Sequence, residues 1–239
     1  MKKAVTYLTS IVLLITVAFL YSFSTAKNYS KRVKKIEIEF KEGNNFFLTQ
    51  TMVNKLLIQN NVTVKNQPKS VIDLQSLEQT VQSNPYIEQA TVFFTIDGVL
   101  KTIVKQRTPV ARVNTNNSSY YVDKQGVVVP LSENYSARVI LVTGKINKEN
   151  LKEITRFVNV ILTDNFLKKE IIGIHKTQND EFILSVRSGQ YKIEFGTLKE
   201  MNIKFKKLKA FYNKAYVDKT IEQYKTINLK YHNQVVCAK

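Results

Sequence analysis

The chain has 239 residues, no tryptophan and one cysteine, and its 36 Lys and Arg exceed its 19 Asp and Glu by 17. This length accommodates a membrane anchor with one or two small domains, and a single cysteine excludes an intramolecular disulfide. The positive charge suits an anionic partner. However, the lysines are spread along the chain, and zinc-finger spacing, RNA-binding aromatic motifs and a leucine zipper are absent, so we expect a solvated basic surface and no nucleic acid.

The N-terminal segment predicts how the chain is attached to the cell. Residues 4–26, AVTYLTSIVLLITVAFLYSFSTA, carry no charge and are long enough to cross a hydrocarbon layer of about 30 Å. We expect residues 1–3 to be a cytoplasmic start and 4–26 to be a retained transmembrane helix. A cleaved signal is the alternative, because Ser24-Thr25-Ala26 supplies the small residues that signal peptidase prefers. Five cations between Lys27 and Lys35 outnumber Lys2 and Lys3, and the positive-inside rule alone would then keep the rest of the chain in the cytoplasm.

The next stretch predicts a small domain. Val33–Phe40 alternates apolar and polar residues as a half-buried strand, and helical spacing follows in Thr49–Ile58, with Thr49 as N-cap, and in Asp73–Gln82. Two runs rich in Val, Ile, Phe and Thr flank Asp97-Gly98, which predicts a hairpin with a type I′ turn. The expected order is β-α-α-β-β over residues 33 to about 107.

After Pro109 the pattern predicts a second, β-rich domain with two helices, which makes the whole chain α+β. A hairpin is expected around Asp123–Gly126. The other expected elements are a strand at Val139–Val142, a helix at Asn147–Lys169, strands at Ile171–His175, Phe182–Val186 and Tyr191–Phe195, a basic helix at Leu198–Tyr216, and a last strand pair at Thr226–Lys230 and Val235–Ala238.

The sequence offers little for catalysis. It has no nucleophile elbow, phosphate-binding glycine loop, dinucleotide motif or metal-ligand spacing, and its two histidines, His175 and His232, are far apart. His175 ends an apolar strand, and Cys237 is expected to be a small packed hydrophobe. We therefore expect no enzyme, no cofactor, no metal and no small-molecule substrate.

The layout resembles that of the FtsQ/DivIB cell-division family. The resemblance is carried by NPYI (84–87), VKQRTPVAR (104–112), Tyr121-Val122-Asp123 with Gly126, Phe195-Gly196 before a Lys-rich helix, and INLKYHNQVV (227–236). It covers nearly the whole chain in the right order. Gln106 stands where the family usually has an acidic residue, and Asn228, Lys230 and Gln234 replace the usual Asp, Arg and Gly of the last motif.

The resemblance implies a single-pass protein of the cell inner (cytoplasmic) membrane, with most of the chain periplasmic and placed at the division septum. Residues 27–107 would form a POTRA domain and residues 108–239 a β domain, joined at Arg107-Thr108-Pro109-Val110. The implied function is a non-enzymatic divisome scaffold that links early and late division proteins and binds FtsB/FtsL-type subunits through its β domain. The alternative is a membrane-anchored POTRA module that handles polypeptides in a secretion or outer-membrane assembly system.

Two surfaces are candidates for partner binding. The last strand pair should lie at a sheet edge, which can accept a partner strand. In the family this region holds the FtsB/FtsL-type subunits, and the candidate residues are Tyr231, which matches the family's aromatic position, His232, Asn233, Gln234, Val235 and Val236. The cations Lys204, Lys206, Lys207 and Lys209 would attract an acidic segment. In the POTRA domain the candidates for recruitment are Val92, Lys105 and Arg107, and the alternative for both cations is a solvated edge that discourages pairing.

Overall fold

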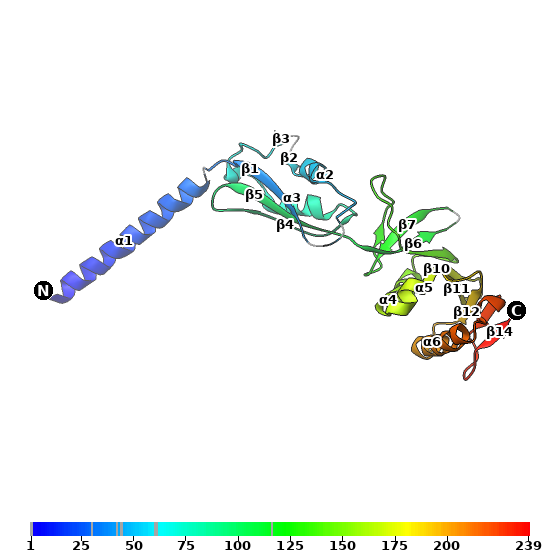
Figure 1. Ribbon diagram of the computed structural model, residues 1–239. Helices are drawn as coiled ribbons and strands as arrows, with labels where there is room; N and C mark the ends of the chain where they lie inside the picture. The colour runs from blue at the N-terminus through cyan, green and yellow to red at the C-terminus, as the bar shows by residue number, and fades with distance from the viewer. Residues whose placement is uncertain (1, 30, 42, 44, 60–61, 116) are drawn as a thin grey trace. The chain divides into compact units, whose positions relative to one another are not determined.

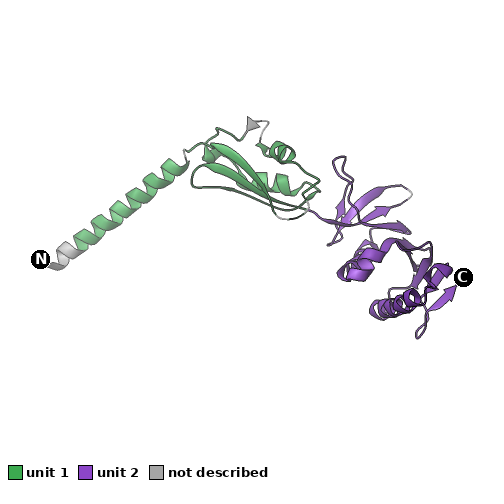
Figure 2. Cartoon of the chain, in the orientation of Figure 1, with its two compact units in different colours: residues 1–106 green, residues 107–239 purple. Residues whose placement is uncertain are grey.

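The computed structural model describes residues 2–29, 31–41, 43, 45–59, 62–115 and 117–239. The chain forms two compact units, 1–106 and 107–239 (Figure 2). Both units contain mixed secondary structure, so the expected α+β class is confirmed.

The N-terminal helix α1 (Lys2–Tyr29) contains a 23-residue stretch, Tyr7–Tyr29, that is long and apolar enough to cross a membrane. At a rise of 1.5 Å per residue this stretch is about 35 Å long, close to the thickness of a bilayer core. Its large apolar side chains are exposed, for example Leu14 at 67% and Phe19 at 68%. A helix of this kind, whose apolar side chains lie outside any protein core, fits a single-pass membrane anchor.

Residues 35–106 form a three-stranded sheet with two helices on one face (Figure 1). The strand order is β1-β5-β4, with β5 antiparallel to β4 and parallel to β1. The elements are β1 (Lys35–Phe40), α2 (Gln50–Leu56), β2 (Ile58–Gln59), β3 (Val62–Thr63), η1 (Lys69–Val71), α3 (Leu74–Gln82), β4 (Ile87–Phe94) and β5 (Val99–Gln106). The predicted β-α-α-β-β order is confirmed, and the short β2–β3 ribbon and η1 are additions that the pattern did not reveal.

Local signals in the sequence set the ends of both helices. The Thr49 side chain accepts a hydrogen bond from Met52 N, and the Asp73 side chain accepts one from Ser76 N, so each caps the helix that follows it. The alternation of β5 puts Leu100 and Val104 against the helices, where they pack with Leu77 of α3. The predicted N-cap at Thr49 is confirmed.

The β4–β5 hairpin is confirmed, but its predicted type I′ turn is wrong. That turn needs positive φ at both central residues, whereas in Thr95–Gly98 only Gly98 has it, at 88°. The loop has three residues, with Gly98 N donating to Thr95 O and Thr95 N donating to Val99 O. Asp97 and Gly98 therefore form the end of a three-residue loop, and Ile96 lies at the tip of that loop.

The second unit is built on a nine-stranded mixed sheet of order β14-β13-β12-β11-β10-β9-β6-β7-β8. Pro109 begins β6, where a missing N–H is tolerated. The elements are β6 (Pro109–Asn114), β7 (Ser119–Asp123), β8 (Val128–Val129), β9 (Ile140–Gly144), α4 (Leu151–Thr163), α5 (Asn165–Glu170), β10 (Ile171–Lys176), β11 (Phe182–Val186), β12 (Lys192–Gly196), α6 (Met201–Val217), η2 (Ile221–Gln223), β13 (Thr226–Asn228) and β14 (Val236–Ala238).

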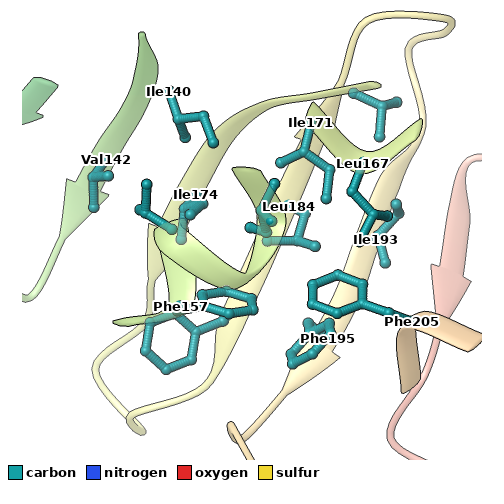
Figure 3. Close-up of a cluster of buried hydrophobic side chains, with 14 of the residues drawn as sticks. Ile140, Val142, Phe157, Leu167, Ile171, Ile174, Leu184, Ile193, Phe195 and Phe205 are labelled. Carbon is teal, nitrogen blue, oxygen red and sulfur yellow. The ribbon is translucent and has the colours of Figure 1, made fainter. Parts of the chain in front are cut away.

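Aromatic packing fixes α4 and α6 against this sheet. Phe157 of α4 contacts Phe182 of β11 and Phe195 of β12, with ring centroids 5.3 and 4.9 Å apart, and Phe205 of α6 lies 5.0 Å from Phe195 (Figure 3). All four rings are buried. Pairs at these separations add to the stabilisation from apolar burial. The core of the second unit therefore packs against β11 and β12, the strands that precede the C-terminal pair β13 and β14.

The predicted single helix Asn147–Lys169 is wrong, because the chain breaks at Asp164. Asp164 has extended backbone angles (φ −100°, ψ 123°), and its side chain accepts hydrogen bonds from Phe166 N and Leu167 N. It therefore ends α4 and caps α5. Lys209 of α6 donates to the same carboxylate at 2.6 Å, and this bond, followed by the two backbone bonds, holds the pKa of Asp164 below its usual value.

Candidate functional site

The last strand, β14, lies at one end of the nine-stranded sheet. It pairs antiparallel with β13, with Asn228 opposite Val236 and Thr226 opposite Ala238. The carbonyl of Ala238 accepts from Lys225 N, so Ala238 directs its backbone groups toward β13. Because successive residues of a strand direct these groups to alternate edges, the N–H and C=O of Cys237 point to the open edge.

Two other sheet edges are less suited to strand addition. On the outer edge of β4, Ala90 N donates to the Gln82 side chain at 2.8 Å and Val92 N donates to the Glu78 side chain at 2.9 Å. The helix α3 therefore occupies these donors. At the far end of the large sheet, β8 has two residues and is followed by Pro130, which has no N–H.

The side chains of β14 and of the loop before it are divided between the core and solvent. Val235 and Cys237 pack against the core, and burial raises the pKa of the Cys237 thiol. On the opposite side, Val236 is 40% exposed. Tyr231 is 51% exposed, and His232, Asn233 and Gln234 are also exposed. The structure therefore places five of the six predicted residues on the surface and turns Val235 inward.

The loop between β13 and β14 is braced from α6. Lys207 Nζ donates to the backbone oxygens of Tyr231, at 2.5 Å, and His232, at 3.1 Å. His232 Nδ1 also lies 3.5 Å from a carboxylate oxygen of Glu200. The backbone that carries the Tyr231 ring is thus held in place before any partner arrives, which lowers the entropy cost of binding.

Two residues that depart from the family pattern contribute to the same loop. The Asn228 side chain donates to Glu194 at 2.6 Å and accepts from Lys230 N at 2.9 Å. Lys230 Nζ contacts Glu181 at 2.9 Å, and this bond raises the pKa of Lys230. Asn228 and Lys230 therefore stabilise the turn within this chain.

The four lysines of α6 that were predicted to attract an acidic segment have different roles. Lys204 is buried, donates to Phe195 O and Thr197 O, and has a pKa lowered by its burial. Lys207 braces the loop and Lys209 pairs with Asp164. Lys206 is exposed, and the Lys209 side chain is 41% exposed although it is paired. Attraction of an acidic segment requires an accessible charge, which Lys204 does not offer because its ammonium group binds the carbonyls at the end of β12.

The predicted POTRA surface is also divided. Val92 is 6% exposed and packs in the core between sheet and helices. Lys105 is 42% exposed and forms an ion pair with Glu88 at 2.8 Å. Arg107 belongs to the second unit, where its side chain is 15% exposed. Only Lys105 of these three is accessible enough to contact a partner directly.

Arg107 forms a largely buried ion pair. Its Nη1 contacts Asp123 Oδ2 at 2.7 Å, and the Asp123 side chain is 5% exposed. The other Asp123 oxygen accepts from Gln125 N and Val127 N and shapes the β7–β8 turn. Arg107 therefore links the start of the second unit to its first hairpin, and its low exposure does not fit a solvated edge.

Gln106 has a structural role as well. Its buried amide oxygen accepts from Phe47 N and Leu48 N, and its amide nitrogen donates to Leu48 O. A neutral amide supplies both kinds of bond, whereas a carboxylate supplies acceptors alone. This explains how the chain tolerates Gln106 where the family usually has an acidic residue.

Glu170, Tyr191 and Tyr212, three buried polar side chains of the second unit, are hydrogen-bonded to one another, whereas the buried Arg107 Nε has no partner within the described residues. The Glu170 carboxylate accepts from Ser188 and from Tyr212, whose hydroxyl also accepts from Tyr191 at 2.8 Å. Burial raises the pKa of Tyr191 to about 12. Within the described residues, no group of three or more His, Cys, Asp and Glu side chains is placed to hold a metal ion.

The candidate membrane helix, the POTRA-type unit and the mixed-sheet unit fit a POTRA protein with a single-pass anchor, and a POTRA-like domain model matches residues 31–105. A family model described as FtsQ/DivIB, C-terminal related, matches residues 108–238. The chain belongs to the FtsQ/DivIB family of cell-division proteins, which confirms the resemblance seen in the sequence. The cell division protein DivIB of Clostridium acetobutylicum is 26% identical over 125 residues, covering 47% of this chain and 50% of that protein. The chain thus spans about half the length of this curated relative.

The sequence analysis did not reveal the contacts that hold the β13–β14 loop and the strand β13 in place. Lys207, Asn228 and Glu194 act over 20 or more residues of sequence, and a lysine-rich helix or a lone Asn gives no local sign of such contacts. One signal was available: the amphipathic spacing of α6, with Phe205, Leu208 and Tyr212 turned to the core, places Lys204 near the same face.

Proposed function

We propose that this chain is a non-enzymatic cell-division scaffold that captures a strand of a partner protein along the open edge of β14. The observation that carries the proposal is the position of β14 at the end of the sheet, beside a braced loop that presents Tyr231. Membership of the FtsQ/DivIB family supports a role in cell division.

In this proposal the backbone provides the anchoring. A partner strand would pair with Cys237, whose N–H and C=O point away from β13, and would extend the nine-stranded sheet. Val236 would supply an apolar contact on the exposed side of the strand. The Tyr231 ring would become desolvated against the partner, a setting in which tyrosine often dominates the binding energy.

The partners that fit the family are FtsB/FtsL-type division subunits, met outside the cytoplasm at the septum of the inner membrane. Lys105, the accessible cation of the POTRA unit, remains a candidate for recruitment by an early-arriving division protein. The alternative of a polypeptide-handling POTRA module receives less support, because the family match over 108–238 lies in the second unit and concerns division proteins.

Replacing the exposed anchor tests this proposal. Tyr231→Ala should weaken capture of FtsB/FtsL-type subunits by about 2 kcal/mol or more, because a desolvated ring is lost from the centre of a small interface. Titration calorimetry of the full chain in detergent against the co-purified subunits measures this loss. Val217→Ala is the control, since Val217 is 82% exposed on α6 and belongs neither to β14 nor to the loop before it. Equal affinity of Tyr231→Ala and wild type would remove Tyr231 from the site.

Topology gives an independent prediction. We expect α1 to be retained as the single span, with the residues that follow Tyr29 outside the cytoplasm. Protease treatment of spheroplasts should then digest both units and leave α1 in the membrane. N-terminal sequencing of the mature protein completes the test, because a chain that begins at Lys27 would mean that the segment is a cleaved signal.

A further inference from the structure

The cations at the end of α1 and directly after it are only partly used by the fold: Arg32 donates to Asn66 O at 2.9 Å, and Lys35 forms an ion pair with Glu37 at 2.8 Å. Lys27, Lys31, Arg32, Lys34 and Lys35 lie within nine residues, which contain no acidic residue. Lys31 and Lys34 are exposed. In the topology proposed above, this basic cluster lies on the extracytoplasmic side, against the usual charge bias of membrane proteins, so its presence there calls for a physical function.

The chain enters the POTRA unit almost immediately after α1. The helix ends at Tyr29, and the carbonyl of Lys31 already accepts from Lys69 N at 2.9 Å. Val33 N then donates to Gln67 O, and Lys34 N donates to Gly98 O. Two residue steps span at most about 7 Å of extended chain. The end of the POTRA unit formed by η1 and the β4–β5 turn is therefore tethered close to the end of α1.

This same end exposes large apolar side chains. Ile96, at the tip of the β4–β5 turn, is 88% exposed, more than any other large hydrophobic side chain in the described part of the chain. Val71 of η1 is 60% exposed, and Lys69 Nζ, two residues earlier, donates to Thr95 O of the turn. An apolar side chain exposed at a loop tip gains little from the fold, whereas an apolar environment outside the chain would stabilise it.

The cations and the exposed apolar side chain of Ile96 lie on one surface. Lys31, Arg32, Lys34, Ile96, Asp97 and Gly98 line a single hollow of about 360 Å³. A side chain at Gly98 would be strained, because its φ is 88° and a Cβ would lie 3.3 Å from the Arg32 carbonyl oxygen. Asp97 is the acidic residue of the turn, and it is outnumbered by the neighbouring cations.

We propose that this end of the POTRA unit docks on the membrane surface, with Ile96 and Val71 entering the interfacial region and Lys31 and Lys34 contacting the phosphates of anionic lipids. Cations beside exposed apolar residues are the combination that binds an anionic interface. The short tether keeps this surface at the bilayer throughout. Docking would fix the orientation of the POTRA unit relative to the membrane, which a free tether would leave undetermined.

The test uses the full chain in lipid nanodiscs, without partner subunits, in a Cys237→Ala background. An environment-sensitive dye is attached at Ile96→Cys or, as the matched site, at Gln89→Cys, an exposed position of β4 five residues (about 17 Å) before Phe94. With phosphatidylglycerol and nitroxide-labelled lipids in the disc, the dye at 96 should shift to shorter wavelength and be quenched, and the dye at 89 should remain unquenched.

Charge reversal supplies the second arm. Lys31→Glu with Lys34→Glu should lower the ratio of docked to undocked chain at least about fivefold for each lysine. Lys55→Glu with Lys65→Glu changes the net charge equally elsewhere on the POTRA unit and should leave quenching unchanged. Equal, weak quenching at 96 and 89 would overturn the proposal, and so would quenching at 96 that appears only when a partner protein is added. Because no partner is needed, failure here leaves strand capture at β14 untouched.

Discussion

Cys237→Pro is expected to lower the affinity for the partner at least tenfold, while the second unit stays folded. Proline removes the outward N–H of Cys237 and places its ring where a partner strand would lie. Tenfold corresponds to about 1.4 kcal/mol, the upper range for one backbone hydrogen bond, before any steric clash is added. The bonds that β14 makes to β13 come from Val236 and Ala238 and are kept. Titration calorimetry of the full chain, with circular dichroism of the free protein, measures both effects.

Two variants of the same strand serve as controls. Cys237→Ala keeps the N–H and loses the thiol, so it should bind the partner nearly as well as wild type. Val236→Pro removes an N–H directed toward β13, so it should damage the hairpin itself and appear as a change in the free protein. If Cys237→Pro bound the partner with unchanged affinity, strand addition at this edge would be ruled out.

Arg107→Ala is expected to lower the free energy of unfolding of the second unit by about 3 kcal/mol. Its loss leaves the Asp123 carboxylate, 5% exposed, without its cation in a buried site. That carboxylate also holds the β7–β8 turn, so the hairpin should loosen with it. Urea unfolding of the full chain in detergent, followed by tyrosine fluorescence, reports this change.

Lys105→Ala, two residues earlier, is the matched control. Its ion pair with Glu88 is at the surface, with the lysine 42% exposed, and such pairs contribute about 0–1 kcal/mol. Similar unfolding curves for the two variants would contradict the structural role of Arg107. The comparison also separates a role in recruitment from a role in stability. If Lys105→Ala lowers recruitment and leaves the free energy of unfolding nearly unchanged, the defect does not come from a damaged fold.

The sequence predicted those features that depend on neighbours in the chain. Thr49 caps its own helix three residues away, and the hairpins around Asp97 and Asp123 close over a few residues, so short patterns suffice. The strand pattern also predicted the C-terminal strand pair, and its place near the end of the chain favoured a sheet edge, where β14 lies.

The features that were missed depend on contacts between distant residues. Asp164 lies within a continuous apolar periodicity, and its capping geometry, supported by Lys209, breaks the helix there. Lys204 and Val92 look accessible in the sequence, because the sequence alone does not show which face of a helix or strand will pack against the core. In the sequence Arg107 looks like a surface cation near Lys105, and only the fold brings Asp123 beside it.

Amide hydrogen exchange of the full chain, measured with and without FtsB/FtsL-type subunits, tests strand capture most directly. The account predicts that exchange slows in Val235–Ala238 and in the loop around Tyr231 when the partner is bound, because the outward amide of Cys237 becomes hydrogen-bonded in an extended sheet. Unchanged exchange in β14, together with slowed exchange confined to the POTRA unit, would contradict it and place the binding surface elsewhere.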